Sequence, residues 1–307
     1  MDSFQISSTD HVQVQAYVWK PEMKAVAVLQ IVHGMQEHAR RYDHFARWMN
    51  DHGIAVYADD HIGHGMSAKT NAELSHFPRK DDWQRSVVIL HELTKKIKAD
   101  HPGVPVFMLG HSMGSVLAQS YMILYCKEID GYILSGVIRQ PVFIAKTGQL
   151  VADLLSVLFG PADRSKVTVF FGYGQYNKQF RPNRTEVDWL CSEPSIVDDY
   201  LASPLCGKPL TNRFYHNLCN GFMHIAKPKN LAKIQVGIPV FLIAGASDPA
   251  GFNGKAPVKL KKLLIKYANA DIGLKLYPDL RHEILNEVNR EDIYRDVLDW
   301  MNKIIFH

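Results

Sequence analysis

Short runs of almost continuous apolar residues, separated by stretches with helical periodicity, constrain the fold of this 307-residue chain more than any other feature. Such runs are typical of parallel strands, which helices cover on both faces. Helical spacing of apolar side chains lies between the runs, as in Trp83, Val87 and Leu90. The alternation predicts an α/β fold with a mostly parallel central sheet flanked by helices. The expected strands are residues 25–32, 54–58, 104–109, 132–134, 240–244 and 274–277.

Two segments of alternating polar and apolar residues, 4–7 and 12–18, predict an antiparallel hairpin at one edge of this sheet. The alternation of strand and helix stops at residues 138–235, where an apolar helical segment precedes a loop-rich stretch with several prolines. We therefore expect a core domain formed by residues 1–137 and 236–307, with a mainly helical cap inserted at residues 138–235. The apolar face of the helical segment at 150–159 is expected to pack onto the core, and contact with lipid is the alternative.

The sequence Gly110-His111-Ser112-Met113-Gly114 matches the G-x-S-x-G motif of a nucleophile elbow. It directly follows an expected strand and directly precedes a helical pattern, which is the strand–turn–helix setting that the motif requires. Glycine at both ends permits a turn tight enough to project the Ser112 hydroxyl above the sheet. We predict that Ser112 is a catalytic nucleophile.

A serine nucleophile needs a histidine base, and the base needs an orienting acid. On this fold the acid and then the histidine follow the serine, each after the carboxyl end of a strand. Asp248 follows the next-to-last expected strand, and His282 follows the last one. Asp271 precedes its strand and would lie at the wrong edge of the sheet, and Asp279 is only three positions from His282. Asp248 and His282 are therefore the predicted partners of Ser112.

The negative oxygen of a tetrahedral intermediate also needs donors. One expected donor is the backbone N–H of Met113, the residue after the nucleophile. The second is the N–H of Met35, because Gly34 permits the backbone after the first parallel strand to turn into the site.

The sequence resembles the α/β-hydrolases of the monoacylglycerol lipase and lysophospholipase group, close to the serine aminopeptidase superfamily. The motifs that carry the resemblance are H-G-M-Q-E-H at residues 33–38, followed by Arg41 and Tyr42, and D-H-I-G-H-G-M-S at residues 60–67. The elbow, the Asp248 loop and His282 with Glu287 complete the pattern.

The resemblance implies the α/β-hydrolase fold, a Ser112–Asp248–His282 triad, and Met35 and Met113 as oxyanion donors. It also implies polar groups near the nucleophile that receive the hydroxyls of a head group, and the candidates are Glu37, Arg41 and His111. Glu37 and Arg41 could instead pair with each other and fix their loop. An acyl pocket would be built from the cap, with Leu150, Leu154 and Phe159 as candidates.

The chain departs from the family pattern in three places. The inserted cap is long, the residue after His282 is the charged Glu283 where an aliphatic residue is expected, and Leu285 stands where some relatives have histidine. The reaction type therefore follows more firmly from the resemblance than the substrate does.

We predict a serine hydrolase that cleaves carboxylic esters of lipids, above all monoacylglycerols, through an acyl-enzyme on Ser112. A lysophospholipase is one alternative, which needs a cation such as Arg181 or Arg184 at the entrance. An N-terminal aminopeptidase is another, which needs a free-amine site. The acidic candidates for that site are Glu186, Asp188, Glu193, Asp198 and Asp199. A non-catalytic binding protein of the same fold is a remote alternative.

The composition excludes several other classes. Net charge is +4 without a basic cluster, so no nucleic-acid partner is expected, although the apolar cap could contact a membrane peripherally. We expect no cofactor, and no metal at His61 and His64, because no carboxylate or cysteine accompanies them at ligand spacing. Four cysteines without metal spacing, no signal-peptide pattern and no apolar run of 18 residues predict a cytoplasmic protein. The oligomeric state stays open.

Overall fold

The structure, a computed structural model, describes residues 1–8 and 10–306, with every side chain among them except that of Phe171. In this part of the chain eight strands form one sheet in the order β1-β2-β4-β3-β5-β6-β7-β8. The strands are β1 (Asp2–Ser7), β2 (Gln13–Trp19), β3 (Ala27–Val32), β4 (Ile54–Asp59), β5 (Val106–His111), β6 (Gly131–Ser135), β7 (Pro239–Gly245) and β8 (Asp271–Tyr277).

The predicted architecture is confirmed strand by strand. The two edge segments form an antiparallel hairpin, and β2 also pairs antiparallel with β4. All remaining pairs are parallel. Strands β3, β4, β5 and β6 are buried along their whole length, which is why their sequences read as unbroken apolar runs.

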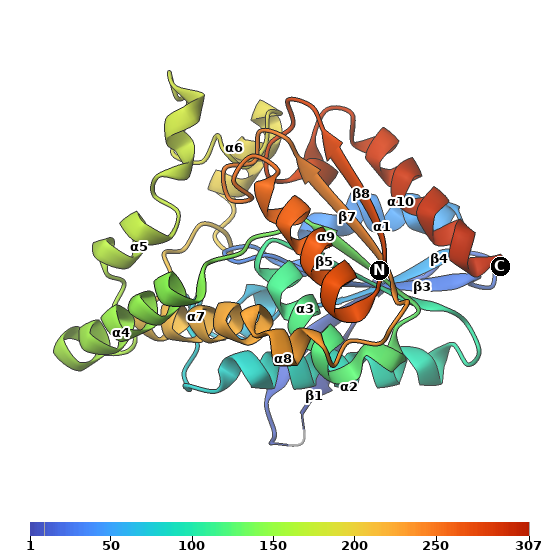
Figure 1. Ribbon diagram of the computed structural model, residues 1–307, viewed down its shortest axis with the longest axis horizontal. Coiled ribbons are helices and arrows are strands. Elements are labelled where there is room, and N and C mark those ends of the chain that lie inside the picture. The colour runs from blue at the N-terminus through green and yellow to red at the C-terminus, as the bar shows by residue number, and fades with distance from the viewer. Residues whose placement is uncertain (9, 307) are drawn as a thin grey trace.

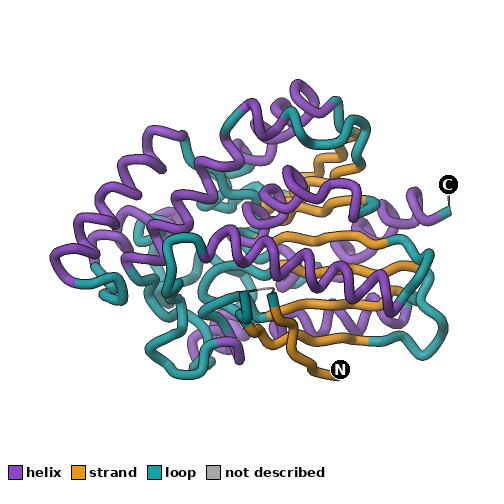
Figure 2. Tube along the Cα trace, turned by 90° about the horizontal axis from the view of Figure 1, so that it is seen from below, coloured by secondary structure: helices purple, strands orange, loops and turns teal. Residues whose placement is uncertain are grey.

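Helices cover both faces of the sheet (Figures 1 and 2). The α-helices are α1 (Asp43–Asp51), α2 (Asp82–Asp100), α3 (Met113–Tyr125), α4 (Val142–Phe159), α5 (Lys166–Gly172), α6 (Pro194–Ala202), α7 (Asn212–Ala226), α8 (Pro228–Leu231), α9 (Lys255–Ala268) and α10 (Arg290–Ile305). Short 3-10 helices are η1 (Ala39–Tyr42), η2 (Gly65–Ser67), η3 (Cys126–Glu128), η4 (Tyr176–Phe180) and η5 (Ile284–Asn286).

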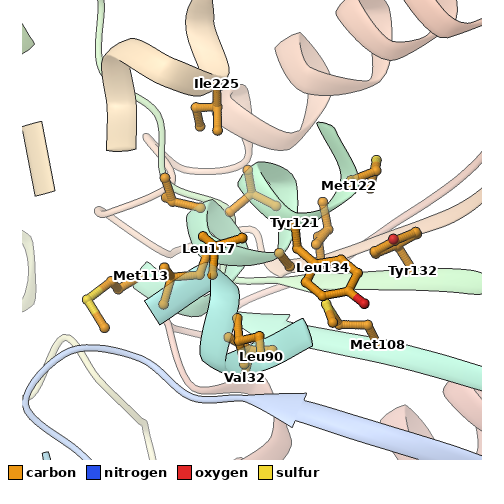
Figure 3. Packing of buried hydrophobic residues seen from close by; sticks show 14 of the residues in the cluster. Val32, Leu90, Met108, Met113, Leu117, Tyr121, Met122, Tyr132, Leu134 and Ile225 are labelled. Atoms are coloured by element: carbon orange, nitrogen blue, oxygen red, sulfur yellow. The ribbon is translucent and has the colours of Figure 1, made fainter. Parts of the chain in front are cut away.

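Helix α3 lies at the centre of the larger of two hydrophobic clusters. Figure 3 shows its side chains, among them Met113, Leu117 and Tyr121, between residues from β3, β5, β6, α2 and α7. All three of these α3 side chains are fully buried. The helix that follows Ser112 is therefore held on several sides, which fixes the direction of its first turn.

The segment between β6 and β7 contains α4 to α8 and no strand among its described residues. Hydrogen bonds join it to loops at the carboxyl ends of the strands, from Gly207 N–H to the Gln36 carbonyl and from Glu283 N–H to the Leu190 carbonyl. Helix α7 is the internal part of this insertion and packs against α2, α3 and α4. The insertion therefore covers the edge of the sheet at which Ser112 lies.

The expectation that the apolar segment 150–159 packs onto the core is wrong. The segment belongs to the longer helix α4, in which Leu150, Leu154 and Phe159 are all more than half exposed. Helix α4 contacts α7 through small residues instead. Ala145 and Ala152 are its buried residues, and a methyl group on Gly148 between them would lie 3.2 Å from the Cys219 sulfur. Close approach through small residues leaves the leucines on the outer face.

Helix α4 is long and apolar enough to cross a membrane by length and composition, the one such helix in the described chain. Both of its ends are held by the same domain, however. Pro141 follows β6, and the Pro161 and Asp163 carbonyls beyond α4 accept hydrogen bonds from the start of α7. A helix whose two ends return to one side of a domain lies along its surface rather than across a bilayer.

Candidate active site

Ser112 lies at the sharp turn between β5 and α3. Its backbone has φ 54° and ψ −117°, a conformation that is strained for a residue with a side chain. The turn is possible because Gly110 and Gly114 lack side chains. A methyl group on Gly110 would lie 2.5 Å from the Gly114 carbonyl oxygen, and one on Gly114 would overlap the Val32 carbonyl. The strain holds the hydroxyl at the top of the sheet, as the motif predicts.

His282 and Asp248 meet at the predicted edge of the sheet. His282 Nδ1 and Asp248 Oδ2 are 2.9 Å apart, and the other oxygen of Asp248 accepts the Ala250 N–H at 2.9 Å. Both side chains are buried. Burial disfavours the charged imidazole, but Asp248, together with Glu283 and Glu37, outweighs burial and raises the pKa of His282. Asp271, the first residue of β8, lies at the opposite end of its strand, so the choice of Asp248 agrees with the geometry.

Ser112 and His282 line one cavity of about 20 Å³, which is room for roughly one water molecule. The cavity is closed above by cap residues that sequence reasoning missed, namely Trp189, Leu190 and Tyr200. Trp189 lies against His282, with ring centres 5.0 Å apart. These residues come from the loop-rich part of the cap, in which no periodicity marks a functional side chain.

The two predicted oxyanion donors lie beside Ser112. Met113 is the first residue of α3, so its N–H belongs to the helix end that lacks intrahelical partners and carries partial positive charge. Met35 lines the cavity together with Gly34. Among the described residues neither N–H donates to the protein. Both donors are therefore free to bind a developing negative oxygen.

Buried histidines lie below the Met35 loop. The ring of His33 stacks on His61 with centres 3.9 Å apart, and His64 meets His33 edge-on at 5.2 Å. His61 Nδ1 lies 2.9 Å from Asp59, and Asp60 accepts the Ala39 N–H at 2.9 Å. The D-H-I-G-H-G-M-S segment thus supports the loop rather than reaching the cavity.

Glu37 and Arg41 pair with each other, as the alternative interpretation held, and a third residue joins them. Arg41 donates from Nη1 to Glu37 at 2.8 Å and forms a two-pronged contact with Glu283, with both distances 2.7 Å. Burial raises the pKa of Glu37. Burial acts the same way on Glu283, but Arg41 outweighs it and lowers the pKa of Glu283 to about 2. Glu37 and Glu283 line the cavity, and Arg41 lies behind them.

His111, the third predicted head-group residue, also lines the cavity. Its ring centre is 4.8 Å from that of His282, and burial, aided by His282, lowers its pKa to about 3. His111 is therefore a neutral neighbour of His282, the predicted base. Gly136 makes room for both rings, because a methyl group there would lie 3.0 Å from His111 and 3.1 Å from His282.

Two further ties connect the cap with the catalytic loops. Gln36 donates to the Tyr173 hydroxyl and to the Lys208 carbonyl, both at 2.8 Å, and so joins the oxyanion loop to the cap. Glu287 accepts the Arg281 N–H at 3.0 Å and the Ser192 N–H, and so joins the histidine loop to the cap. The resemblance pointed to Glu287, whereas no sequence signal indicated Gln36.

The structure does not bring the remaining candidates to the cavity. Leu150, Leu154 and Phe159 lie on the outer face of α4. Arg184 is bound to Asp198 and to the Pro194 carbonyl, and Arg181 is exposed. None of the five acidic residues considered for a free amine lines the cavity. Among them, Asp188 accepts from Thr185, and Glu193 caps α6.

Comparison with known proteins finds similar chains over most of the length of this one. The family model described as serine aminopeptidase, S33, matches residues 23–289. A monoacylglycerol lipase of Mycolicibacterium smegmatis is 27% identical over 92% of this chain and 91% of its own, and a human monoglyceride lipase is 27% identical over 93% and 85%. A probable lysophospholipase of Haemophilus influenzae is 23% identical over 93% and 86%.

A solved structure extends the likeness to three dimensions. The crystal structure of a thermostable carboxyl esterase from Bacillus coagulans, in complex with glycerol, superposes with a TM-score of 0.91. It is 28% identical in sequence, over 99% of this chain and 98% of that one.

Proposed function

This chain belongs to the serine aminopeptidase S33 family, and we propose that it hydrolyses monoacylglycerols to a fatty acid and glycerol. The observation that carries the reaction type is one small cavity lined by Ser112, His282 and Met35, with His282 hydrogen-bonded to Asp248 outside the lining. The glyceryl ester is supported by the relatives that are monoacylglycerol lipases and by the glycerol bound to the esterase of the same fold.

The reaction follows from the positions of these groups. Ser112 Oγ attacks the ester carbonyl while His282 Nε2 takes the hydroxyl proton, and Asp248 stabilises the charged imidazole. The carbonyl oxygen becomes negative and accepts from the Met35 and Met113 N–H groups. His282 returns the proton to the alcohol oxygen as the ester bond breaks. A water molecule, deprotonated by His282, then releases the fatty acid and restores Ser112.

The two alternatives lack support at the cavity. A lysophospholipase would need a cation for phosphate, but neither Arg181 nor Arg184 lines the site. An aminopeptidase would need carboxylates free to bind an amine. The two carboxylates that line the cavity, Glu37 and Glu283, both accept from Arg41. An alcohol that needs no direct ion pair with either carboxylate is the leaving group that fits this arrangement.

The test is fatty-acid release from a medium-chain monoacylglycerol by the wild type and by Ser112→Ala. Loss of the nucleophile is expected to lower kcat by several orders of magnitude. Ser112-dependent turnover of short aryl esters with no release from the monoacylglycerol would contradict the lipid substrate while leaving the triad in place. An unchanged rate in Ser112→Ala would contradict the mechanism.

A lipid substrate also gives the outer face of α4 a role. Leu150, Leu154, Val157 and Leu158 are between 57% and 82% exposed on this helix. Exposed apolar side chains in such number on one helix favour contact with a lipid surface. The proposal therefore includes peripheral binding of the cap to the membrane that holds the substrate. A cytoplasmic location is part of the same proposal, supported by four free, buried cysteines.

A further inference from the structure

The departing alcohol must lie beside His282. The imidazole gives its proton to the alcohol oxygen as the ester bond breaks, so the two atoms are within hydrogen-bond distance at that moment. Glu283, Glu37 and Tyr200 line the same small cavity as His282. A substituent next to the alcohol oxygen therefore lies close to the charges of the Glu283 and Glu37 carboxylates.

Those charges are not balanced. Two carboxylates, Glu37 and Glu283, share the single guanidinium of Arg41. The remaining partners of both carboxylates are neutral donors. Glu37 accepts the Gly34 N–H at 2.6 Å and the Tyr42 hydroxyl at 3.0 Å, and Glu283 accepts the Asn286 amide at 2.8 Å. Side-chain exposure is 5% for both carboxylates and 12% for Arg41, so water screens these charges weakly.

Arg41 is the cation that an anionic alcohol would need, and Glu283 holds it. A guanidinium binds phosphate through two parallel N–H groups. In this chain both terminal nitrogens of Arg41 donate to Glu283 at 2.7 Å, and the group lies over the Tyr200 ring, 5.0 Å from its centre. Glu283 thus occupies the donors and adds a negative charge of its own.

From this arrangement we propose that Glu283 determines leaving-group specificity, so that the enzyme cleaves esters of uncharged or cationic alcohols and rejects esters whose alcohol carries phosphate. This inference rests on the proposed ester hydrolysis and narrows its substrate class. The net charge of the whole chain is +4, which attracts anions from solution and so acts in the opposite direction to the proposed rejection of phosphate esters. Rejection of anions therefore has to arise in the cavity.

The test compares three decanoyl esters that share the acyl chain and differ in the alcohol: glycerol, glycerol 3-phosphate and choline. All three are supplied below their aggregation limits, and kcat/KM is measured for each. For the wild type we expect the phosphate ester to react at least tenfold more slowly than the glycerol ester, and the choline ester to react at least as fast. Wild-type values within threefold for the phosphate and glycerol esters would overturn the proposal.

Three variants assign the selection to Glu283. Glu283→Gln removes one negative charge and leaves one terminal N–H group of Arg41 without its carboxylate acceptor, so that this group can bind phosphate. The phosphate-to-glycerol ratio of kcat/KM is therefore expected to rise about tenfold or more. Glu283→Asp keeps the charge and is expected to keep the wild-type ratio. Glu291→Gln makes the same change of net charge at an exposed pair with Arg295 and should leave the ratio unchanged.

The phosphate-to-glycerol ratio of kcat/KM distinguishes a role of Glu283 in specificity from a role in stabilising the site alone. A variant that only loosens the site lowers the rates with all three esters alike, and an unchanged ratio in Glu283→Gln would overturn the assignment. If Glu283→Gln does not fold, the wild-type order and Glu283→Asp still decide the question. Failure of the proposed function looks different, because then no decanoyl ester reacts while short aryl esters are still cleaved through Ser112.

Discussion

At the residue scale, two opposing effects act on the pKa of His282. Burial favours its neutral form, whereas the Asp248 carboxylate, assisted by Glu283 and Glu37, favours the charged form and prevails, so its pKa is raised above the ordinary 6.5. A general base must be neutral to accept the serine proton. The carboxylates around His282 therefore stabilise the charged imidazole that forms during the reaction. They also increase the fraction of enzyme in which His282 is already protonated, and so inactive, at low pH.

The pH profile is expected to show this directly. Because protonated His282 cannot act as a base, kcat/KM for an uncharged aryl ester should fall as pH drops, with an acid limb above pH 6.5. Asp248→Asn is expected to lower kcat about 10³- to 10⁴-fold and to move the limb downward. Rates over a range of pH at constant ionic strength measure both. An acid limb well below pH 6 in the wild type would contradict the assignment.

Arg41 carries a second consequence at this scale, for stability. Removing one partner of a buried ion pair leaves uncompensated charge, which costs about 3–5 kcal/mol. Arg41→Ala leaves Glu37 and Glu283 close together with no cation, so the free energy of unfolding should fall by that amount at pH 7.5.

Denaturant unfolding measures the loss, and Arg184→Ala is the control. The pair of Arg184 with Asp198 is exposed, and such pairs contribute about 1 kcal/mol or less. Similar losses in the two variants would show that the buried network contributes no more than a surface pair.

At the element scale, the junction of β5 and α3 places both Ser112 and the Met113 N–H. It depends on the absence of a side chain at Gly114, where a methyl group would overlap the Val32 carbonyl of β3. Backbone atoms cannot yield as a flexible side chain does. Gly114→Ala is therefore expected to destabilise the fold by about 3 kcal/mol, the upper end for overpacking, and to lower kcat by displacing both groups.

Gly103→Ala is the matched control for this change. Gly103 has φ +74°, but a methyl group there meets no atom within 4 Å. The cost is then the backbone term alone, about 1–2 kcal/mol, with no effect on kcat. Thermal unfolding and aryl-ester hydrolysis distinguish the two variants, and equal behaviour would mean that close packing at the junction is not what positions Ser112.

Helix α4 provides the second prediction for an element. Burying a leucine side chain contributes about 1.5–3 kcal/mol, so Leu154→Asp with Leu158→Asp should weaken binding to phospholipid vesicles at least tenfold. Both side chains are exposed on the outer face, so kcat/KM for a soluble aryl ester should stay the same. Vesicle co-sedimentation measures the binding. Retained sedimentation of the double variant would place the membrane contact elsewhere.

At the scale of the whole molecule, the sequence predicted what local pattern and chain order determine. Six strands follow from apolar runs and the two edge strands from alternating residues, and the positions of Ser112, Asp248 and His282 follow from the strands that they come after. The packing of the cap helices could not be predicted in the same way. The direction in which α4 faces depends on Ala145 and Ala152 fitting against α7, and a periodicity of leucines carries no information about that fit.

The other features that the sequence did not predict are contacts between distant parts of the chain. Arg41 meets Glu283 across 242 residues, and Gln36 meets Tyr173 across 137. A single sequence shows that Glu283 is unusual, but it does not show which cation the carboxylate holds. The departure that made the substrate uncertain at the level of sequence becomes the basis of a specificity proposal once its partner is seen.

The buried histidines set the response of the whole fold to acid. Burial is the leading cause that lowers the pKa values of His64 and His111, both to about 3, and that of His33 well below 6.5. These groups stay neutral in the native state but bind protons near 6.5 when unfolded, so their contribution to stability is present above pH 6.5 and is lost as pH falls below it. His61 and His282 have raised pKa values, so their contribution is already complete below pH 6.5 and adds no further slope there.

His64 and His111 then each lose about 2 kcal/mol of their contribution to stability between pH 7 and pH 5, since one pKa unit corresponds to about 1.4 kcal/mol. Their sum, roughly 4 kcal/mol, approaches the lower end of the stability of a typical domain, about 5–15 kcal/mol, and burial lowers the pKa values of His33 and His38 in the same direction. We expect unfolding to set in between pH 5 and pH 4. Urea unfolding at pH 7, 6 and 5 measures the slope, and His64→Gln, outside the cavity, should reduce the loss between pH 7 and pH 5 by about 2 kcal/mol. A free energy of unfolding that is constant from pH 7 to pH 5 would show that these rings take up protons without loss of the fold.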